Sequence, residues 1–308
     1  MENIELNIIK GKLGGTVFKY NRFLKLSNDH YLIRNNGCLQ LCKIKDSKFI
    51  GICSSPKFVW PVLGILELKD KNIMVSGRNF IKIFKINNNK FELIQDFYSY
   101  DFAELLDIYQ LENEKILVNS ILGTLYLIIK KQGKYEIIKE IEIERRNHSI
   151  ENIGENKIIL IESFYDYNDF RHPCLTHSNI SILDFNGENV DKKIINTKYK
   201  ISLNHFTKSI FNLKNGFLFF LSGNNIFVFN LKYQEIIQIY EMENFLIDKI
   251  CYKDDEYLCI FADNKVALAS FKSEFIIKEI KEYNKNELKP LRFIIVNEKI
   301  SLYCDEVD

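Results

Sequence analysis

The chain has 308 residues, of which 46% are hydrophobic and 13% are aromatic, so it can bury a large core. Its 42 basic and 41 acidic residues leave a net charge of +1, which excludes a strongly basic surface for nucleic acid over the whole molecule. The longest apolar runs, such as residues 217–221, are far too short to span a membrane, and the first residues lack the pattern of a signal peptide. We therefore expect a cytoplasmic protein, with the nucleus as a second location, and no membrane partner.

The seven cysteines are an odd number, and several of them lie in apolar runs that are expected to form strands. This pattern is typical of buried, reduced thiols in an intracellular protein, and it favours neither a disulfide framework nor a metal site. We expect no bound metal and no cofactor.

From the N-terminus, the first expected elements are two strands, at residues 4–9 and 16–21. A phrase then recurs seven times: an apolar run, three or four polar turn residues and a second apolar run, as in FLKLSNDHYLI and ILELKDKNIMV. The last residues before the turns are spaced by 42, 43, 42, 60, 39 and 44 positions. A period of about 40–45 residues with one hairpin per period is typical of β-propeller blades. These residues before the turns are Leu26, Leu68, Leu111, Ile153, Leu213, Tyr252 and Val296.

Two further runs follow each of the first six hairpins. The first alternates apolar and polar residues, as in Ile81/Ile83, and the second is a run such as KFELIQDF. Glycine and asparagine stand between the hairpin and the alternating run, where tight turns need residues that tolerate a positive φ. Each repeat therefore predicts four antiparallel strands, which we name a to d.

The repeats predict an all-β fold: one seven-bladed β-propeller domain of four-stranded antiparallel blades over residues 1–308. The chain starts with a c strand at 4–9 and a d strand at 16–21, and it stops just after the seventh a–b hairpin. We expect these N-terminal c and d strands to pair with the C-terminal a and b strands. Such closure would remove exposed sheet edges.

The c strands also carry a family resemblance. Their phrases QLCK (40–43), KIFK (82–85), SILD (181–184) and FVFN (227–230) are similar to the apolar–x–apolar–Trp–Asp phrase of WD repeats. The chain resembles the WD-repeat propellers along its whole length, although the family's Gly-His pair is missing. The resemblance implies a scaffold that binds peptides or protein surfaces on the face built from d–a and b–c loops. The Trp position would be held by Cys42, Phe84, Leu183 and Phe229, and Asp184 keeps the Asp.

Aromatic and basic residues gather in the expected d–a and b–c connections, which open on one face by propeller topology. Aromatic residues and arginine are enriched among the residues that dominate protein interfaces. We expect this face to bind an acidic or phosphorylated segment of a partner protein, and RNA less readily. The alternatives are a solvated rim without a partner and, for the single tryptophan, packing over a blade edge. The candidate residues are Lys57, Trp60, Arg78, Tyr98, Tyr100, Arg145 and Arg146.

The step of 60 residues places an insertion, FYDYNDFRHPCLTH (164–177), in the b–c connection of the fourth complete blade. Insertions on a regular scaffold often carry function, so Phe170 and Arg171 join the candidate binding residues. His172, Cys174 and His177, with Asp169 as a fourth ligand, could bind zinc, but their spacing matches no established pattern. An interaction loop is favoured over a metal site, and an insertion without any role is the other alternative.

An enzyme is the main rival class. Catalytic propellers need carboxylates, histidines or metal ligands that converge from the a strands on the central channel. The a strands here are apolar, with scattered polar residues such as Asp107 and Asp248 and with His205 nearby. We therefore predict a non-catalytic protein-interaction scaffold that is a subunit of a larger complex. A channel hydrolase or lyase, and an RNA-binding subunit of a ribonucleoprotein, are the alternatives.

Overall fold

The computed structural model describes most of the chain. The described residues are 7–11, 23–35, 37–46, 48–143, 148–166, 174–187, 189–203, 210–212, 216–242, 247–252, 257–262, 265–271, 275–282, 290–296 and 299–305. They fall in two compact units, Met1–Ile8 with Asn147–Cys304 and Ile9–Arg146 with Asp305–Asp308. Each unit is described by itself, and the expectation of one domain over residues 1–308 stays a prediction.

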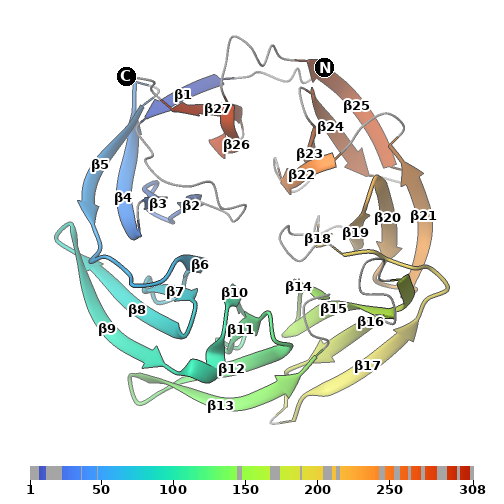
Figure 1. The fold of residues 1–308 in the computed structure, drawn as a ribbon, viewed down its shortest axis with the longest axis horizontal. Helices are drawn as coiled ribbons and strands as arrows, with labels where there is room; N and C mark the ends of the chain where they lie inside the picture. Colours follow the sequence, from blue (N-terminus) through green and yellow to red (C-terminus); the bar gives the residue numbers. More distant parts are fainter. Residues whose placement is uncertain are drawn as a thin grey trace. The chain divides into compact units, whose positions relative to one another are not determined.

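Among the described residues, five sheets consist of four antiparallel strands in chain order, which confirms the all-β fold (Figure 1). Two of these sheets lie in the unit of residues 9–146. The first contains β6 (Val62–Glu67), β7 (Ile73–Gly77), β8 (Phe80–Asn87) and β9 (Lys90–Tyr98). The second contains β10 (Leu105–Gln110), β11 (Ile116–Ser120), β12 (Thr124–Lys131) and β13 (Lys134–Glu142). A 3-10 helix, Tyr100–Phe102, lies between the two sheets in the sequence.

The other three sheets lie in the unit that contains residues 147–304. The first contains β14 (His148–Gly154), β15 (Lys157–Asp166), β16 (Cys174–Asp184) and β17 (Asp191–Asn196). The second contains β18 (Ile210–Asn212), β19 (Phe217–Ser222), β20 (Asn225–Asn230) and β21 (Glu235–Glu241). The third contains β22 (Ile247–Tyr252), β23 (Tyr257–Ala262), β24 (Lys265–Phe271) and β25 (Phe275–Glu282).

The remaining strands follow the same order. β2 (Phe23–Lys25), β3 (Tyr31–Asn35), β4 (Cys38–Lys45) and β5 (Lys48–Ser54) pair consecutively and antiparallel. β1 (Asn7–Gly11) pairs in parallel with β5 through Lys10 and Lys48. β26 (Pro290–Val296) and β27 (Lys299–Asp305) form an antiparallel hairpin. All seven expected a–b hairpins are therefore present, whereas the strand expected at 16–21 lies outside the described residues.

The a–b turns explain why the repeated phrase folds in this way. In the β6–β7 turn, the Leu68 N–H donates to the Asn72 carbonyl at 2.8 Å, and the Lys71 N–H donates back to the Leu68 carbonyl at 2.8 Å. Lys71 has a φ of 66°, and the Asp70 carboxylate accepts from the Asn72 N–H at 3.1 Å. Three-residue hairpin loops with one left-handed residue have this form. The β2–β3 and β10–β11 turns make the same main-chain bonds around Leu26 and Leu111.

The c and d strands share a register break. In five c–d pairs the partner positions shift by one residue at the place where a WD repeat has its tryptophan, which is the pattern of a β-bulge. The β16–β17 pair differs, because its register is unbroken from Asn179 to Asp184. The shifts fall between Leu41 and Cys42, Ile83 and Phe84, Leu127 and Ile128, Val228 and Phe229, and Leu268 and Ala269.

The residues expected at the tryptophan position are buried, as predicted. Phe84 is 2% exposed, and Cys42, Leu183 and Phe229 are also buried. Phe84 packs edge-on against Phe58 and Phe91 in the core between β2–β5 and β6–β9. Burial raises the pKa of the Cys42 thiol to about 12, so this thiol is unreactive at neutral pH. Four cysteines form no disulfide bond: Cys38, Cys42, Cys53 and Cys174.

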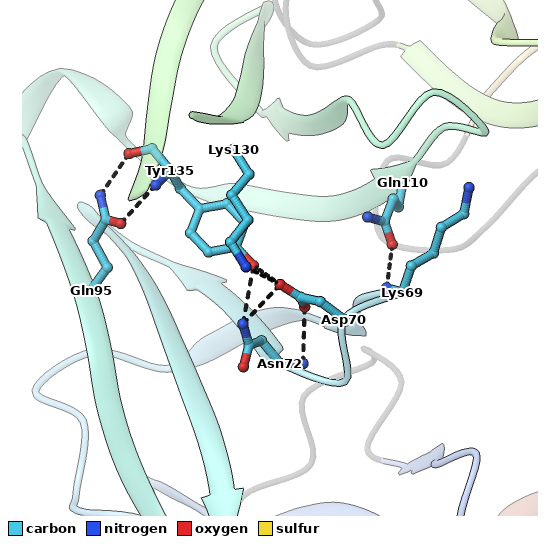
Figure 2. Close-up of polar contacts among 7 residues, drawn as sticks. All are labelled: Lys69, Asp70, Asn72, Gln95, Gln110, Lys130 and Tyr135. Carbon is cyan, nitrogen blue, oxygen red and sulfur yellow. Dashed lines mark hydrogen bonds and ion pairs between the residues drawn. The ribbon is translucent and has the colours of Figure 1, made fainter. Parts of the chain in front are cut away.

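Polar contacts fix the a–b turn of β6–β7 to the neighbouring sheet, as Figure 2 shows. The Asp70 carboxylate accepts hydrogen bonds from the Tyr135 hydroxyl at 2.7 Å and from the Lys130 ammonium at 2.6 Å. The Lys69 N–H donates to the Gln110 side-chain oxygen at 2.7 Å. Partial burial alone would raise the pKa of Asp70, but the bonds from Lys130, Tyr135 and Asn72 outweigh it and hold the pKa below its usual value.

One of these contacts recurs along the chain. At three pre-turn positions, the residue just before the turn reaches the a–b hairpin of the preceding sheet. Glu67 accepts from the N–H and the hydroxyl of Ser27 at 2.7 Å each, in the same way that Gln110 accepts from Lys69. In the other unit, the Asn212 amide donates to the Asn152 carbonyl at 3.1 Å. The repeated register therefore aligns each sheet with its neighbour within a unit.

Candidate protein-interaction surface

The d–a connection before β6 is held in place by two residues, Ser55 and Phe58. The residues between and after these two are exposed. The Ser55 N–H donates to the Leu39 carbonyl at 2.8 Å, and the Ser55 hydroxyl accepts from the Leu39 N–H at 2.9 Å. Phe58 stacks on Phe80 with ring centres 5.5 Å apart. Because Ser55 and Phe58 are held, Lys57 and the Val59–Trp60 pair face solvent.

Trp60 lies against Arg78, which belongs to the turn between β7 and β8. The Arg78 guanidinium carbon is 4.9 Å from the centre of the Trp60 ring, a cation–π contact worth about 0.5–1 kcal/mol at an exposed site. Gly77 makes this approach possible. A Cβ at Gly77 would lie 2.4 Å from the Pro61 carbonyl oxygen and 2.6 Å from the Phe80 ring. The absence of a side chain at Gly77 therefore lets the Trp60–Pro61 segment cover the turn.

Asn79 links Arg78 to two tyrosines of the next connection. Its φ of 68° suits an asparagine, and its N–H donates to the Ala103 carbonyl at 2.8 Å. The Asn79 carbonyl accepts from the Ser99 N–H at 3.1 Å, and the Asn79 side chain hydrogen-bonds Tyr98. Tyr98 and Tyr100 meet edge to face with centroids 5.4 Å apart, and their hydrogen bond raises the pKa of Tyr98. We call Lys57, Val59, Trp60, Arg78, Tyr98 and Tyr100 the Trp60 surface.

Exposed apolar side chains are unevenly distributed over the described part of residues 9–146. Five large ones lie at the ends of the sheets where the b–c turns and d–a connections are, with Val59 89% and Tyr100 80% exposed. The others lie on the d strands, and none lies in the described a–b turns. Large exposed hydrophobic groups that cluster on one face are typical of interaction sites. The five are Val59, Trp60, Tyr98, Tyr100 and Leu122.

The structure thus brings together four of the candidate residues, Trp60, Arg78, Tyr98 and Tyr100, and it places Lys57 on the same connection. Arg34, which the sequence places beside a b–c turn, is half-buried and donates a hydrogen bond to the Val62 carbonyl. The other candidates, Arg145, Arg146, Phe170 and Arg171, lie outside the described residues.

Sequence reasoning missed two members of this region. Val59 is the most exposed large hydrophobic residue in the described part of the chain, and Asn79 makes the hydrogen bonds that connect the Arg78 turn to the Tyr98–Tyr100 segment. A signal for Asn79 was present, because asparagine after Gly77-Arg78 is typical of a turn position with positive φ. No sequence pattern distinguishes Val59 from a core valine.

The insertion at 164–177 is different from the loop that the sequence predicts. Phe164–Asp166 and Cys174–His177 continue strands β15 and β16 as an antiparallel hairpin. Two contacts support this extension: Phe164 stacks on His177 with centroids 4.4 Å apart, and the Thr176 hydroxyl donates to the Phe164 carbonyl at 2.9 Å. Among the residues that the structure describes, no group of three or more His, Cys, Asp or Glu side chains is placed to hold a metal ion. The zinc hypothesis also involves Asp169 and His172, which lie outside that set.

In the described part of the chain, no helix has the length and apolarity needed to cross a membrane.

Comparisons with known proteins identify the fold. No family model and no curated protein matches the sequence. A chain from a crystal structure of the mitotic checkpoint complex superposes with a TM-score of 0.63 at 10% identity, covering 94% of this chain and 84% of that one. The chain resembles WD-repeat propellers. A protein from Lactobacillus plantarum superposes with a TM-score of 0.61 at 9% identity, covering 84% of this chain and 83% of that one.

A third solved structure, the C-terminal WD40 domain of Sif2, has a TM-score of 0.48 at 10% identity and covers 80% of this chain and 79% of that one. The superposition on the chain from the mitotic checkpoint complex, with a TM-score of 0.63, confirms the resemblance predicted from the c-strand phrases as a likeness of fold. At these identities the likeness to WD-repeat propellers says nothing about which molecules this chain binds.

Proposed function

We propose that the protein is a non-catalytic interaction scaffold that binds a segment of another protein through the Trp60 surface. The observation that carries the proposal is the fixed pairing of Trp60 with Arg78 at an exposed position. Both residues stand on anchored main chain, so little conformational entropy is lost when a partner binds them. Tryptophan, tyrosine and arginine are the residue types that most often dominate binding energy.

Two further observations support the scaffold proposal. Five exposed large apolar side chains in the described part of residues 9–146 lie at the ends of the sheets with the b–c turns and d–a connections, whereas the Asp70 side chain of the β6–β7 turn is engaged with the neighbouring sheet. The chain with a TM-score of 0.63 belongs to a multiprotein assembly, the mitotic checkpoint complex. A role as a subunit of a larger complex in the cytoplasm or nucleus is part of the proposal.

The test is a binding measurement with matched variants. Proteins that co-purify with the intact chain from its native cells are identified, and the stoichiometric one is purified for calorimetry. Trp60→Ala with Arg78→Ala is expected to weaken its binding by about 2 kcal/mol or more. Lys232→Ala with Tyr233→Ala is the control, because Lys232 lies 5.5 Å from the Tyr233 ring in another exposed cation–aromatic pair. Equal effects of the two double variants, or none of either, would contradict the proposed surface.

We also propose that the seven hairpins belong to seven blades, and that residues 4–9 and 16–21 supply the c and d strands for the blade of β26 and β27. Five of the six steps between successive hairpins are 39–44 residues long, which supports this arrangement. Removal of residues 1–12 is expected to expose a strand edge and cause aggregation. A soluble truncated protein with an unchanged melting temperature would contradict this closure.

A further inference from the structure

The Arg78 guanidinium is positioned as an anion-binding group. It has five N–H donors, and in the described part of the chain its contact is with the face of the Trp60 ring. No described carboxylate forms an ion pair with Arg78, although Lys82 and Asp96 form one on β8 and β9 of the same sheet. Stacking on an aromatic ring holds a guanidinium while leaving its N–H edge available for hydrogen bonds.

The charges around Arg78 limit which anion fits. Lys57 contributes a second positive charge on the d–a connection. Two carboxylates share the region: Glu104 pairs with Arg78 through the main chain, and Asp101 directly follows Tyr100. The two positive and two negative charges cancel. Asp101 and Glu104 repel any bound anion, and they repel a phosphate with about two negative charges, or a polyanion, more strongly than a single carboxylate that pairs with Arg78.

Apolar groups flank the same point. Trp60 contacts Arg78 directly, and Val59 precedes Trp60 with 89% of its surface exposed. On the other connection, Tyr98 is joined to Arg78 through Asn79, the next residue in the chain. When an anionic group of a ligand reaches the Arg78 guanidinium, the ligand residues one or two positions away therefore face the aliphatic and aromatic side chains of Val59, Trp60 and Tyr98.

We propose, as a deepening of the proposed function, that the Trp60 surface recognises an unphosphorylated acidic segment of a partner protein. An Asp or Glu carboxylate of this segment accepts two parallel hydrogen bonds from Arg78, a geometry that lysine cannot reproduce. An apolar side chain next to that carboxylate packs against Val59, Trp60 and Tyr98. The combination of one carboxylate with one apolar neighbour defines the sequence preference of the site.

The experiment uses the intact protein and a phage-displayed library of random decapeptides. Peptides that bind wild type but not Trp60→Ala are synthesised in three forms: as selected, with each Asp or Glu changed to its amide, and with phosphoserine in the acidic position. Binding is followed by fluorescence anisotropy on wild type, Arg78→Ala, Arg78→Lys and the control Lys90→Ala, which removes an exposed charge at the β8–β9 turn.

The expected result is an acidic residue beside an apolar one in the selected peptides. The amide form should bind wild type at least about tenfold more weakly, and Arg78→Ala should lose about the same factor for the acidic form. The Arg78→Ala variant should bind the acidic and amide forms with equal affinity, because the guanidinium is the group that distinguishes a carboxylate from an amide. Arg78→Lys should recover only a small part of the loss, and Lys90→Ala should bind as wild type does.

Other outcomes separate the two proposals. If Trp60-dependent peptides lack an acidic residue, or bind equally as amides, the surface binds proteins but the carboxylate inference is wrong. If the phosphoserine form binds wild type about tenfold more tightly than the acidic form, the ligand is a phosphopeptide and the inference is overturned. If no peptide depends on Trp60, while the native partner also binds Trp60→Ala normally, the proposed function itself is contradicted.

Discussion

The side-chain amide of Gln95 forms two hydrogen bonds with the main chain of Tyr135, one as donor and one as acceptor, as a residue of a neighbouring β-strand does. Its nitrogen donates to the Tyr135 carbonyl at 2.6 Å, and its oxygen accepts from the Tyr135 N–H at 2.9 Å. Gln95 lies on β9 and Tyr135 on β13, so one side chain connects the d strands of two neighbouring sheets. It satisfies two main-chain groups at a point where the sheets themselves exchange no ladder bonds.

Gln95→Ala is therefore expected to lower the free energy of unfolding by about 1–3 kcal/mol, because it leaves both partly buried groups of Tyr135 without this partner. Urea denaturation of the intact protein measures the change. Gln95→Glu is the informative companion, since it keeps an acceptor for the N–H but removes the donor to the carbonyl. An unchanged urea midpoint for both variants would mean that water replaces the amide without cost.

Gly77→Ala is expected to separate Trp60 from Arg78. The new Cβ would lie 2.4 Å from the Pro61 carbonyl, and a main-chain atom cannot move away cheaply. We expect a loss of about 1–3 kcal/mol in stability and a shift of tryptophan fluorescence. Trp60 is the single tryptophan in the chain, so the emission reports this site alone. Gly187→Ala is the control, because its nearest atoms lie 3.8 Å away, and identical spectra for both variants would contradict the expected displacement.

Phe84→Ala is expected to cost about 3–5 kcal/mol, because it removes a ring that packs against Phe58 and Phe91 in a closed core. Thermal and urea unfolding measure the effect. Leu93→Ala on the neighbouring strand is the comparison, since Leu93 is 52% exposed and should change stability by less than about 0.5 kcal/mol. A loss below about 1 kcal/mol for Phe84→Ala would mean that the core around it collapses to fill the space.

Asp70→Asn tests the charged contacts of the β6–β7 turn. The pKa of Asp70 is lower in the folded protein than in the unfolded chain, so its carboxylate stabilises the fold at pH values above about 4. This stabilisation disappears as the pH falls through the lowered pKa. We expect Asp70→Asn to be less stable than wild type at pH 7, with a difference that shrinks on acidification below about pH 4. Urea unfolding over this pH range measures it.

Asp29→Asn is the control for that series. Asp29 occupies the corresponding turn and pairs with Lys25, but its side chain is 85% exposed. Exposed pairs contribute little to stability, so this variant should follow wild type at every pH. A difference between Asp70→Asn and wild type that stays constant down to pH 3 would assign the effect to hydrogen-bond geometry and not to charge.

The sequence predicts the hairpins well because their turns are local. The polar loop after Leu68 needs a left-handed residue and a side-chain acceptor, and the residues at Lys71 and Asp70 supply them within one short segment. The sequence predicts a loop at 164–177 because the step of 60 residues exceeds the regular period there. The strands of this insertion are extended by pairwise contacts, such as Phe164 on His177, which join residues 13 positions apart and which no periodicity reveals.

The sequence predicts which residues form the candidate surface, but it does not predict how these residues contact one another. Trp60 and Arg78 could each be chosen by residue type, but their contact depends on the close approach of Pro61 to Gly77. The same limit applies to the register breaks beside Phe84 and Phe229. A β-bulge depends on how one strand packs against the next, and neither strand alone indicates it.

The register breaks of the d strands determine how foreign chains can adhere to these sheets. A strand that joins an edge needs an unbroken row of main-chain donors and acceptors, and the bulges interrupt that row on the edge strands β9, β13, β21 and β25. β17 has an even register but begins with Asp191, Lys192 and Lys193, whose charges discourage flat pairing. Edge-to-edge polymerisation is thus opposed by backbone shape on four of these edges and by charge on the fifth, so side chains determine which molecules the described sheets bind.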